Sequence, residues 1–478
     1  MLLDSHINRR GFLGDSATLL GSAALATLLS GDLAPAADTP IAPSIQPGRP
    51  HAARHAHFPP HARQVLMIFC SGGFSSIDSF DYKPELVRRH GEPLPGKKLI
   101  TFQGEQGSLT RPLYPFRPRG QCGKMVSSLV DHLGEFADEM CFVHSVTTKT
   151  NSHGPAENVM STGFTLDGFP SIGAWVSYAL GSEASDLPAF VAIPDPRGKP
   201  QSSVNNWGPG FLPAAFQGTD FNAAQPIRNL ARPASISPAA DAATRRFLDS
   251  LNRKHLDRFP GDSQLAARIA SYRLAARMQT SAREALDISK ETRATQELYG
   301  IHVPATSDYG TRCLIARRMV ERGVRFVQVY TQNQFWDHHG GIAKSLPRSC
   351  KKVDQPSAAL VTDLKQRGLL DSTVVHWGGE MGRLPVIQNE KNIGRDHNTS
   401  GFSMWLAGGG FRGGVAYGKT DEFGHKAVDK VVHHYDYHAT LFHLFGLDAD
   451  KVAFTRNAQD KTILDGQPGK IVHDLLDA

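Results

Sequence analysis

Cysteine is scarce in this 478-residue chain, which holds five cysteines at wide spacings and no C-x-x-C pair. Zinc sites built mainly from cysteine need such closely spaced pairs, so the sequence argues against this class of site. An odd number of cysteines leaves at least one free thiol, although one disulfide, such as Cys122–Cys141, is compatible with an exported protein. Histidine is abundant by contrast, with 21 residues, and neutral imidazole is the commonest side-chain metal ligand.

Dense basic runs are also missing, although the formal net charge is +6 and the isoelectric point is about 9.0. Short basic patches such as Arg88-Arg89-His90 and Lys351-Lys352 are more typical of a solvated surface than of a nucleic-acid footprint. Nucleic acid is therefore not expected as a partner. A mildly basic surface instead favours anionic substrates.

The only marked apolar run near the amino terminus, residues 17–29, is short and interrupted by glycine, so no stable membrane span is expected after signal removal. Paired arginines, Arg9-Arg10, precede this run, and small residues suited to peptidase cleavage follow at 34–37. Residues 1–37 therefore resemble a twin-arginine signal peptide. An ordinary surface helix is the alternative. The signal predicts a periplasmic or extracellular protein exported by the twin-arginine route.

The remaining chain predicts one large domain. Residues 38–60 are rich in proline, alanine and histidine, which indicates a disordered leader. A single α/β domain is expected over residues 61–475, beginning with a continuous apolar strand at 64–70. The composition predicts an irregular insertion near 195–235 and a helical section near 239–298.

Short β-rich runs in the second half each lie beside glycine turns that carry an acid or an imidazole. The runs are residues 326–330, 373–377 and 402–407. In a parallel sheet this order places the polar groups at the carboxyl ends of the strands, where such folds bind their ligands. The pattern predicts a doubly wound, mostly parallel sheet with helices on both faces and an active-site edge.

Asp337, His339, Glu380, Asp396 and His397 lie in these turns and are candidate metal ligands. A divalent ion needs carboxylates and imidazoles that converge, and an Asp-x-His loop can supply two of them. The sequence does not choose between His338 and His339, and it allows Glu380 to pair with Arg383 instead. We therefore predict a divalent metal site, with zinc, calcium, magnesium and manganese all open.

Other polar residues allow two interpretations each. Asp78, after the first strand and a Gly-Gly turn, is either a ligand or a turn cap. His438 is either a ligand or a buried core histidine. Ser152 stands at a predicted helix start, where free N–H groups favour anions, and is either a nucleophile or an N-cap. The adjacent His153 is a candidate ligand or base.

The motifs resemble a known family when they are taken in order. They are Gly-Gly-x-Ser-x-Ile-Asp-x-Phe-Asp, Trp-Asp-His-His, Gly-Gly-Glu-x-Gly-Arg, Gly-Arg-Asp-His-Asn, Gly-Gly-Gly-x-x-Gly-Gly and Asp-x-His-Ala-Thr. Over about residues 60–470 the chain is similar to the exported "domain of unknown function 1501" family, sulfatase-like proteins of the alkaline-phosphatase superfamily. The resemblance implies an alkaline-phosphatase/sulfatase-like α/β sheet with metal ligands at strand ends.

The resemblance also implies roles for individual residues. Enzymes of the superfamily hold one or two divalent ions through Asp and His groups, and they attack esters with an activated Ser, Thr or formylglycine. Asp337 and His339 resemble one metal position, and Glu380 stands where an Asp-His pair is usual. Asp396 with His397 supplies the remaining imidazole position, and Asp78 the carboxylate near the first strand.

Two departures from the superfamily pattern bear on activity. The first strand ends in Ser71-Gly72-Gly73 instead of an acid-bearing turn. No cysteine or serine lies in a C/S-x-P-x-R setting, so formylglycine cannot form in the usual way. Ordinary sulfatase chemistry is therefore not expected.

The leading hypothesis is an exported metallohydrolase acting on a phosphate or sulfate ester, including esters of a polysaccharide. Ser152 or a bound water is the expected nucleophile, and Arg383 and Arg395 are the expected anion clamps because a guanidinium fork matches such oxyanions. The alternative is a non-catalytic binding or assembly protein that retains the fold. Genes of the family often neighbour genes for cytochrome-domain proteins, which makes a periplasmic cytochrome-domain protein a candidate partner.

Overall fold

The computed structural model describes residues 42–46, 49–184, 186–221, 233–388 and 390–477. The predicted signal peptide, the first residues of the predicted leader and residues 222–232 of the predicted insertion lie outside these ranges. Within them, none of the helices combines the length and the apolar character that crossing a membrane would need.

A nine-stranded sheet forms the centre of the described domain, in the order β12-β4-β11-β8-β1-β7-β5-β6, with β15 also paired to β4. All neighbouring pairs are parallel except those of β11, which runs antiparallel to both β8 and β4. The strands are β1 (Gln64–Phe69), β4 (Met140–Thr147), β5 (Phe190–Ile193), β6 (Thr219–Asp220), β7 (Phe326–Tyr330), β8 (Thr373–Gly378), β11 (Phe402–Ala407), β12 (Val415–Tyr417) and β15 (Val432–His433). The mostly parallel sheet expected from the sequence is confirmed.

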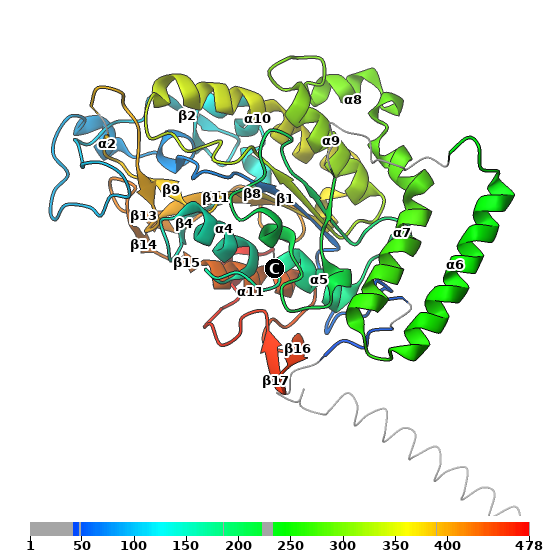
Figure 1. The fold of residues 1–478 in the computed structure, drawn as a ribbon. Helices are drawn as coiled ribbons and strands as arrows, with labels where there is room; N and C mark the ends of the chain where they lie inside the picture. The colour runs from blue at the N-terminus through cyan, green and yellow to red at the C-terminus, as the bar shows by residue number, and fades with distance from the viewer. Residues whose placement is uncertain (1–41, 47–48, 185, 222–232, 389, 478) are drawn as a thin grey trace, which may run out of the picture. The chain divides into compact units, whose positions relative to one another are not determined.

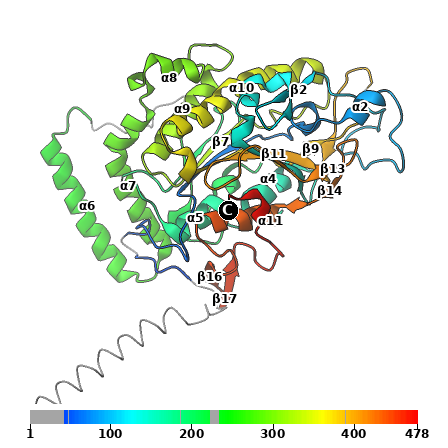
Figure 2. The same cartoon turned by 180° about the vertical axis from the view of Figure 1, so that it is seen from behind.

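Helices cover both faces of this sheet (Figures 1 and 2). On one face pack α9 (Ser307–Glu321) and α10 (Ile342–Gln366), and on the other α4 (His153–Thr162), α5 (Ile172–Leu180) and α11 (His434–Leu444). Strand β1 shows why both faces need cover, because Leu66 and Ile68 belong to one core and Val65 and Met67 to the other. A continuous apolar run of this kind is typical of a strand buried between two helical layers.

The predicted helical section is present as α6 (Pro238–Arg258), α7 (Ser263–Leu286) and α8 (Arg293–Leu298). Helix α6 begins where Ser237 Oγ accepts a hydrogen bond from the Ala240 N–H and proline follows at the first helical position. Helix α7 contributes Ala282 and Ala285 to the core, whereas α6 has no buried residue and packs against α7. These two helices therefore form a hairpin at the side of the domain.

Residues 49–60, expected to belong to a disordered leader, instead lie along the domain. The Arg54 guanidinium donates to the carbonyls of Ser177, Tyr178 and Ala179, at distances of 2.8, 2.8 and 3.2 Å. These are carbonyls of the last turn of α5, where a helix runs out of its own donors, although the Ser177 carbonyl also accepts from the Gly181 N–H. Composition alone did not predict this ordered segment, because its position is fixed by hydrogen bonds to the end of α5 and not by a hydrophobic core of its own.

The described part of the predicted insertion is also ordered. It forms two short 3-10 helices, Ser203–Trp207 and Ala214–Phe216, followed by β6. Trp207 and Phe216 are buried in the core beneath α5. Irregular backbone is therefore anchored here by aromatic side chains.

All five cysteines are free thiols in this structure, so the disulfide considered between Cys122 and Cys141 is absent. Cys122 is exposed and the other four are buried. Burial raises the pKa of Cys141 and of Cys313 to about 12, which makes them poor nucleophiles.

Candidate metal centre

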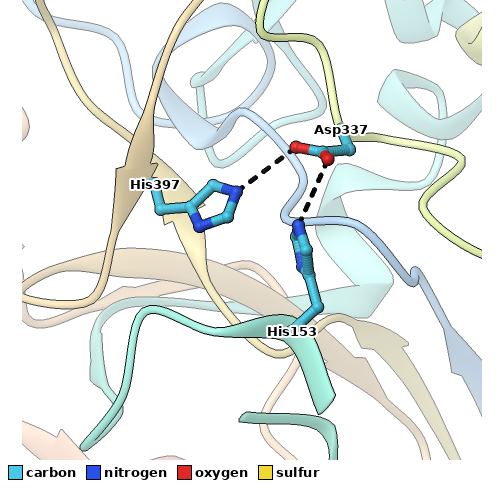
Figure 3. Close-up of side chains that lie close together, drawn as sticks. All are labelled: His153, Asp337 and His397. Atoms are coloured by element: carbon cyan, nitrogen blue, oxygen red, sulfur yellow. Dashed lines mark hydrogen bonds and ion pairs between the residues drawn. The ribbon is translucent and has the colours of Figure 1, made fainter. Parts of the chain in front are cut away.

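Four side chains converge at the carboxyl edge of the sheet, and we call them the edge cluster: His153, Asp337, His339 and His397 (Figure 3 shows three of them). His153 opens α4, Asp337 and His339 follow β7, and His397 lies on a short strand, β10 (His397–Asn398), which pairs with β9 (Gly382–Arg383). Because β4, β7 and β8 are all parallel to β1, the loops that follow them meet at one edge.

The Asp337 carboxylate is the centre of this cluster. Its Oδ1 lies 2.9 Å from His339 Nε2 and 3.3 Å from His397 Nε2, and its Oδ2 lies 3.4 Å from His153 Nε2. The Nε2 atoms of His339 and His397 are only 3.1 Å apart. All three imidazoles therefore present the same ring nitrogen to one carboxylate.

The other ring nitrogen of each imidazole faces an oxygen. His153 Nδ1 lies 2.7 Å from Glu380 Oε1, His397 Nδ1 lies 2.6 Å from the Asn151 carbonyl, and His339 Nδ1 lies 2.6 Å from Gln388 Oε1. Gln388 Nε2 donates to the Gln103 carbonyl, which turns its amide oxygen towards His339. Each Nδ1 must then donate, so in the neutral ring each Nε2 carries a lone pair. Outer oxygens that fix the ring in this way are typical of metal-binding histidines.

The residues present fit a divalent cation. His153 Nε2 and Glu380 Oε2 are both buried without a hydrogen-bond partner among the described residues. Burial lowers the pKa of His153, but Asp337 and Glu380 oppose this effect and raise it to about 9. Burial raises the pKa of Asp337, yet its three histidine neighbours and Arg383 hold it far below its usual range. The site therefore attracts positive charge, and three nitrogens with one carboxylate are a zinc-type donor set.

Glu380, predicted as a metal ligand, contacts the edge cluster through His153 Nδ1. Its side chain is fully buried, and Oε1 accepts from His153 Nδ1 and, at 2.8 Å, from the Gly72 N–H. Gly72 has a φ of +109°, and a Cβ there would lie 2.7 Å from the Gln334 carbonyl carbon. Glycine thus lets the turn after β1 approach the site. Glu380 contacts His153 Nδ1 and lies outside the two groups of candidate metal ligands.

Asp396 also has mainly backbone partners. Its Oδ2 accepts from the N–H groups of Phe102 and Gln103 at 2.7 and 2.8 Å, and its Oδ1 accepts from the His397 N–H at 2.8 Å. The Phe102 ring stacks on the His397 ring, with centroids 4.7 Å apart. Asp396 Oδ1 lies 3.8 Å from His339 Nδ1 and could join His339 and His397 in a second, overlapping ligand group. Its main contacts hold the 102–103 loop over the site.

The structure does not place Asp78 in the edge cluster. Asp78 is fully buried, and its Oδ2 accepts from Arg395 Nε at 2.8 Å and from Ser75 Oγ at 2.6 Å. Its Oδ1 accepts from the Leu113 N–H at 3.3 Å. The interpretation of Asp78 as a metal ligand is therefore corrected to a buried ion pair.

Arg383 and Arg395, predicted as anion clamps, are only 2% and 1% exposed. Arg383 donates to Asp337 at 2.6 Å and to the carbonyls of Gly72, Gly73, Trp336 and Arg395. Arg395 donates to Asp78 and to the carbonyls of Leu384, Thr110 and Arg111. Both guanidinium groups are engaged by protein oxygens, so the structure gives them a structural role and not that of a clamp.

Three interpretations that the sequence left open become clearer. His338 is in neither group of candidate ligands, and His339 is the member of the pair that joins the cluster. His438 is buried with Nε2 3.0 Å from the Met160 carbonyl, and burial lowers its pKa to about 3, so it is a core histidine. Ser152 is the N-cap residue of α4, but its side chain makes no capping hydrogen bond.

Sequence reasoning missed Glu157, Gln388 and the Asn151 carbonyl. Glu157 is fully buried, with Oε1 2.7 Å from Ser71 Oγ and Oε2 accepting from the Ser202 N–H. Burial and the nearby Glu380 raise its pKa to about 7. Glu157 follows His153 by four residues on α4, which places both side chains on one helix face. This spacing could have predicted from the sequence that Glu157 lies near the site.

A cavity of about 720 Å³ opens beside His339. Its lining is mostly amide and glycine, with one acid and one base: Gln103, Gly340, Gln388, Glu390, Lys391 and Asn392. Gln388 belongs both to this wall and to the support of His339. The cavity offers a polar, nearly neutral approach to the cluster.

The sheet, its two helical layers and the edge cluster define an α/β protein with a candidate metal centre at the carboxyl edge. The chain belongs to the family described as "Protein of unknown function (DUF1501)", whose model matches residues 62–476. The family resemblance expected from the motifs is thereby confirmed.

Solved structures with a similar arrangement share little sequence with this chain. The lipoteichoic acid synthase LtaP from Listeria monocytogenes has a TM-score of 0.34 and 10% identity over 85% of this chain and 78% of its own. A 4S-sulfatase of Bacteroides thetaiotaomicron gives 0.35 and 11%, over 81% and 73%. The phosphonate monoester hydrolase SpPMH from Silicibacter pomeroyi gives 0.32 and 11%, over 86% and 76%. No curated protein sequence matches the chain.

Proposed function

We propose that this chain is an exported hydrolase of phosphate or sulfate esters that works with a bound divalent metal ion. The observation that supports this most directly is the convergence of three imidazole Nε2 atoms on the Asp337 carboxylate. Export rests on the resemblance of residues 1–37 to a twin-arginine signal, which favours a periplasmic or extracellular location.

His153, Asp337, His339 and His397 would hold the ion, and Glu380, Gln388 and the Asn151 carbonyl would keep the imidazoles in the binding tautomer. When bound, the ion would supply Lewis-acid polarisation of the ester and activation of the nucleophile. A set of three nitrogens and one carboxylate favours zinc over calcium or magnesium, because the latter two prefer oxygen ligands.

Ser152 or a water molecule is the proposed nucleophile. Ser152 directly precedes His153 at the amino end of α4, where unpaired N–H groups and the helix dipole stabilise negative charge. Since Arg383 and Arg395 are engaged elsewhere, recognition of the ester anion falls to this helix end and to the metal. The amide-lined cavity suits a hydroxyl-rich leaving group, such as part of a polysaccharide.

Elemental analysis of the purified protein tests the site, with turnover of nitrophenyl phosphate and nitrophenyl sulfate measured in parallel. We expect stoichiometric metal in the wild type and its loss in His397→Ala and His339→Gln. His338→Gln is the matched control, because its ring lies outside the cluster, and it should keep the metal. Loss of metal in His338→Gln but not in His339→Gln would contradict the assignment.

The nucleophile is tested separately with Ser152→Ala. Turnover that falls to background while metal content stays stoichiometric would support the serine route. Turnover that stays at the wild-type level would assign the attack to water. The two routes share the same metal centre, so this comparison does not depend on which metal is found.

The second candidate function is a non-catalytic binding protein, which is favoured by the internal engagement of both arginines and by Ser71 at the end of β1. A stable, metal-free wild type without ester hydrolysis would support it. The partner to test would then be a periplasmic cytochrome-domain protein.

A further inference from the structure

Helix α6 exposes apolar side chains that no described element covers. Phe247 is 64% exposed, Leu248 50% and Leu251 45%, and Phe259 just beyond the helix is 54% exposed. Figure 1 shows α6 as the outer helix of its hairpin, with α7 between it and the rest of the domain. These residues serve neither the core nor the edge cluster.

The side of α6 that faces α7 is identified by its contacts. Arg245 Nη1 donates to the Ala276 carbonyl of α7 at 3.1 Å, and Asp249 Oδ1 accepts from Arg273 Nε of α7 at 2.8 Å. Asp241 pairs with Arg245 at 2.6 Å on the same side. Of the three acidic residues of α6, Asp249 therefore pairs with α7 and Asp241 pairs with Arg245, which itself bonds α7.

The opposite side carries apolar and basic residues. Phe247, Leu251, Lys254 and Arg258 follow one another at spacings of four, three and four residues, which places them on one face of a helix. Arg246 and Arg253 are also exposed on α6, and Asp257 is the one exposed acid of this helix. None of these four basic residues forms an ion pair with another described residue. The outer face of α6 is thus that of a basic amphipathic helix.

We propose that this outer face docks onto an anionic membrane surface. A helix with aromatic and leucine side chains flanked by Arg and Lys lies in the plane of an interface, with its apolar side among the headgroups and its cations near lipid phosphates. A second copy of the chain fits less well, because it would bring four unpaired cations of each protomer together. The docking is independent of the reaction at the edge cluster.

The test is sedimentation of the full-length protein with vesicles of phosphatidylcholine alone or mixed with phosphatidylglycerol. We expect binding only to the anionic vesicles, weakening as salt rises. Lys254→Glu/Arg258→Glu and Phe247→Ser/Leu251→Ser should each lower the binding constant at least about tenfold. Because every variant keeps the same residues 1–41, differences between them belong to α6.

Matched controls change the same chemistry elsewhere on the surface. Lys419→Glu/Lys426→Glu alters the net charge equally, and Leu166→Ser/Val428→Ser removes two other exposed apolar side chains. Both should bind like the wild type, and all variants should unfold at similar temperatures. No binding by the wild type, or equal loss in variants and controls, would overturn the proposal. A dimer in light scattering that only the Phe247→Ser/Leu251→Ser variant loses would instead assign the face to a second copy.

Discussion

Two buried groups of charges in this domain differ in the cations they contain. On α9, the fully buried Arg317 lies 2.8 Å from Glu291, 2.8 Å from Asp363 and 2.7 Å from Glu321. In the edge cluster, Asp337 is surrounded by three imidazoles together with Arg383. A guanidinium stays charged at every accessible pH, whereas an imidazole can release its proton to make room for another cation.

This difference separates structure from function. The Arg317 group joins α9 to α10 and to the segment before α8, so it fixes helix positions. The edge cluster lies beside an open cavity, and three of the cations or potential cations around Asp337 are imidazoles. Both groups bury charge. The edge cluster differs because its imidazoles can lose their protons and bind a metal ion, and this property indicates a metal site.

The largest expected effect on stability comes from breaking the Arg317 group. Arg317→Ala removes the fully buried cation of three carboxylates and leaves them the more exposed Arg367, with Arg318 also at Glu291, which should lower the free energy of unfolding by about 3 kcal/mol. Denaturant unfolding measures this. Arg293→Ala, which removes the exposed pair with Glu297, is the control and should cost less than about 1 kcal/mol. Equal costs for the two variants would contradict the distinction, and metal content should not change in either.

A smaller effect is expected at the support of the edge cluster. Glu380→Ala removes the acceptor of His153 Nδ1 and should weaken metal binding about 10- to 100-fold, while Glu380→Gln keeps an acceptor oxygen and should weaken it less. Competition with a chelating dye measures the affinity without any substrate.

Glu157→Gln is the matched control for Glu380. Glu157 is equally buried, but its side chain bonds Ser71 and Ser202 and no member of the edge cluster. Its metal affinity should stay within a few fold of the wild type. If Glu157→Gln weakened metal binding as strongly as Glu380→Ala, the orientation of His153 would not be the cause.

Much of the fold and part of this site were predictable from sequence. Continuous apolar runs followed by glycine turns predicted the parallel sheet, and the turns after β7 and β8 gave Asp337, His339 and Glu380. The role of Glu380 was not predictable, because a strand-end acid looks the same whether it touches the ion or a histidine. Asn151 contributes only a backbone carbonyl, which leaves no trace in residue type.

Asp78, Arg383 and Arg395 show the opposite limit. Their residue types suit a metal ligand or an anion clamp, and they lie beside glycine turns, where such residues are expected. Only the structure shows that Asp78 and Arg395 face each other across 317 positions of chain. Pairings between distant segments decide whether a polar side chain remains available, and a single sequence carries no direct signal of them.

The last prediction, which concerns stability at acidic pH and not at neutral pH, distinguishes a core histidine from the edge cluster. His438 is buried with its pKa lowered from 6.5 to about 3, mainly by burial, so it stays neutral in the folded protein while the unfolded chain takes up a proton near pH 6.5. Its contribution to stability is therefore present above about pH 6.5 and is lost as pH falls towards 3, at about 1.4 kcal/mol per pH unit. His438→Gln should reduce the pH dependence of unfolding in this range and leave metal content unchanged, since the amide can still donate to the Met160 carbonyl. Unfolding curves collected across this range check the slope. An unaltered slope would contradict the buried, neutral state of His438, and a loss of metal in this variant would place it with the edge cluster.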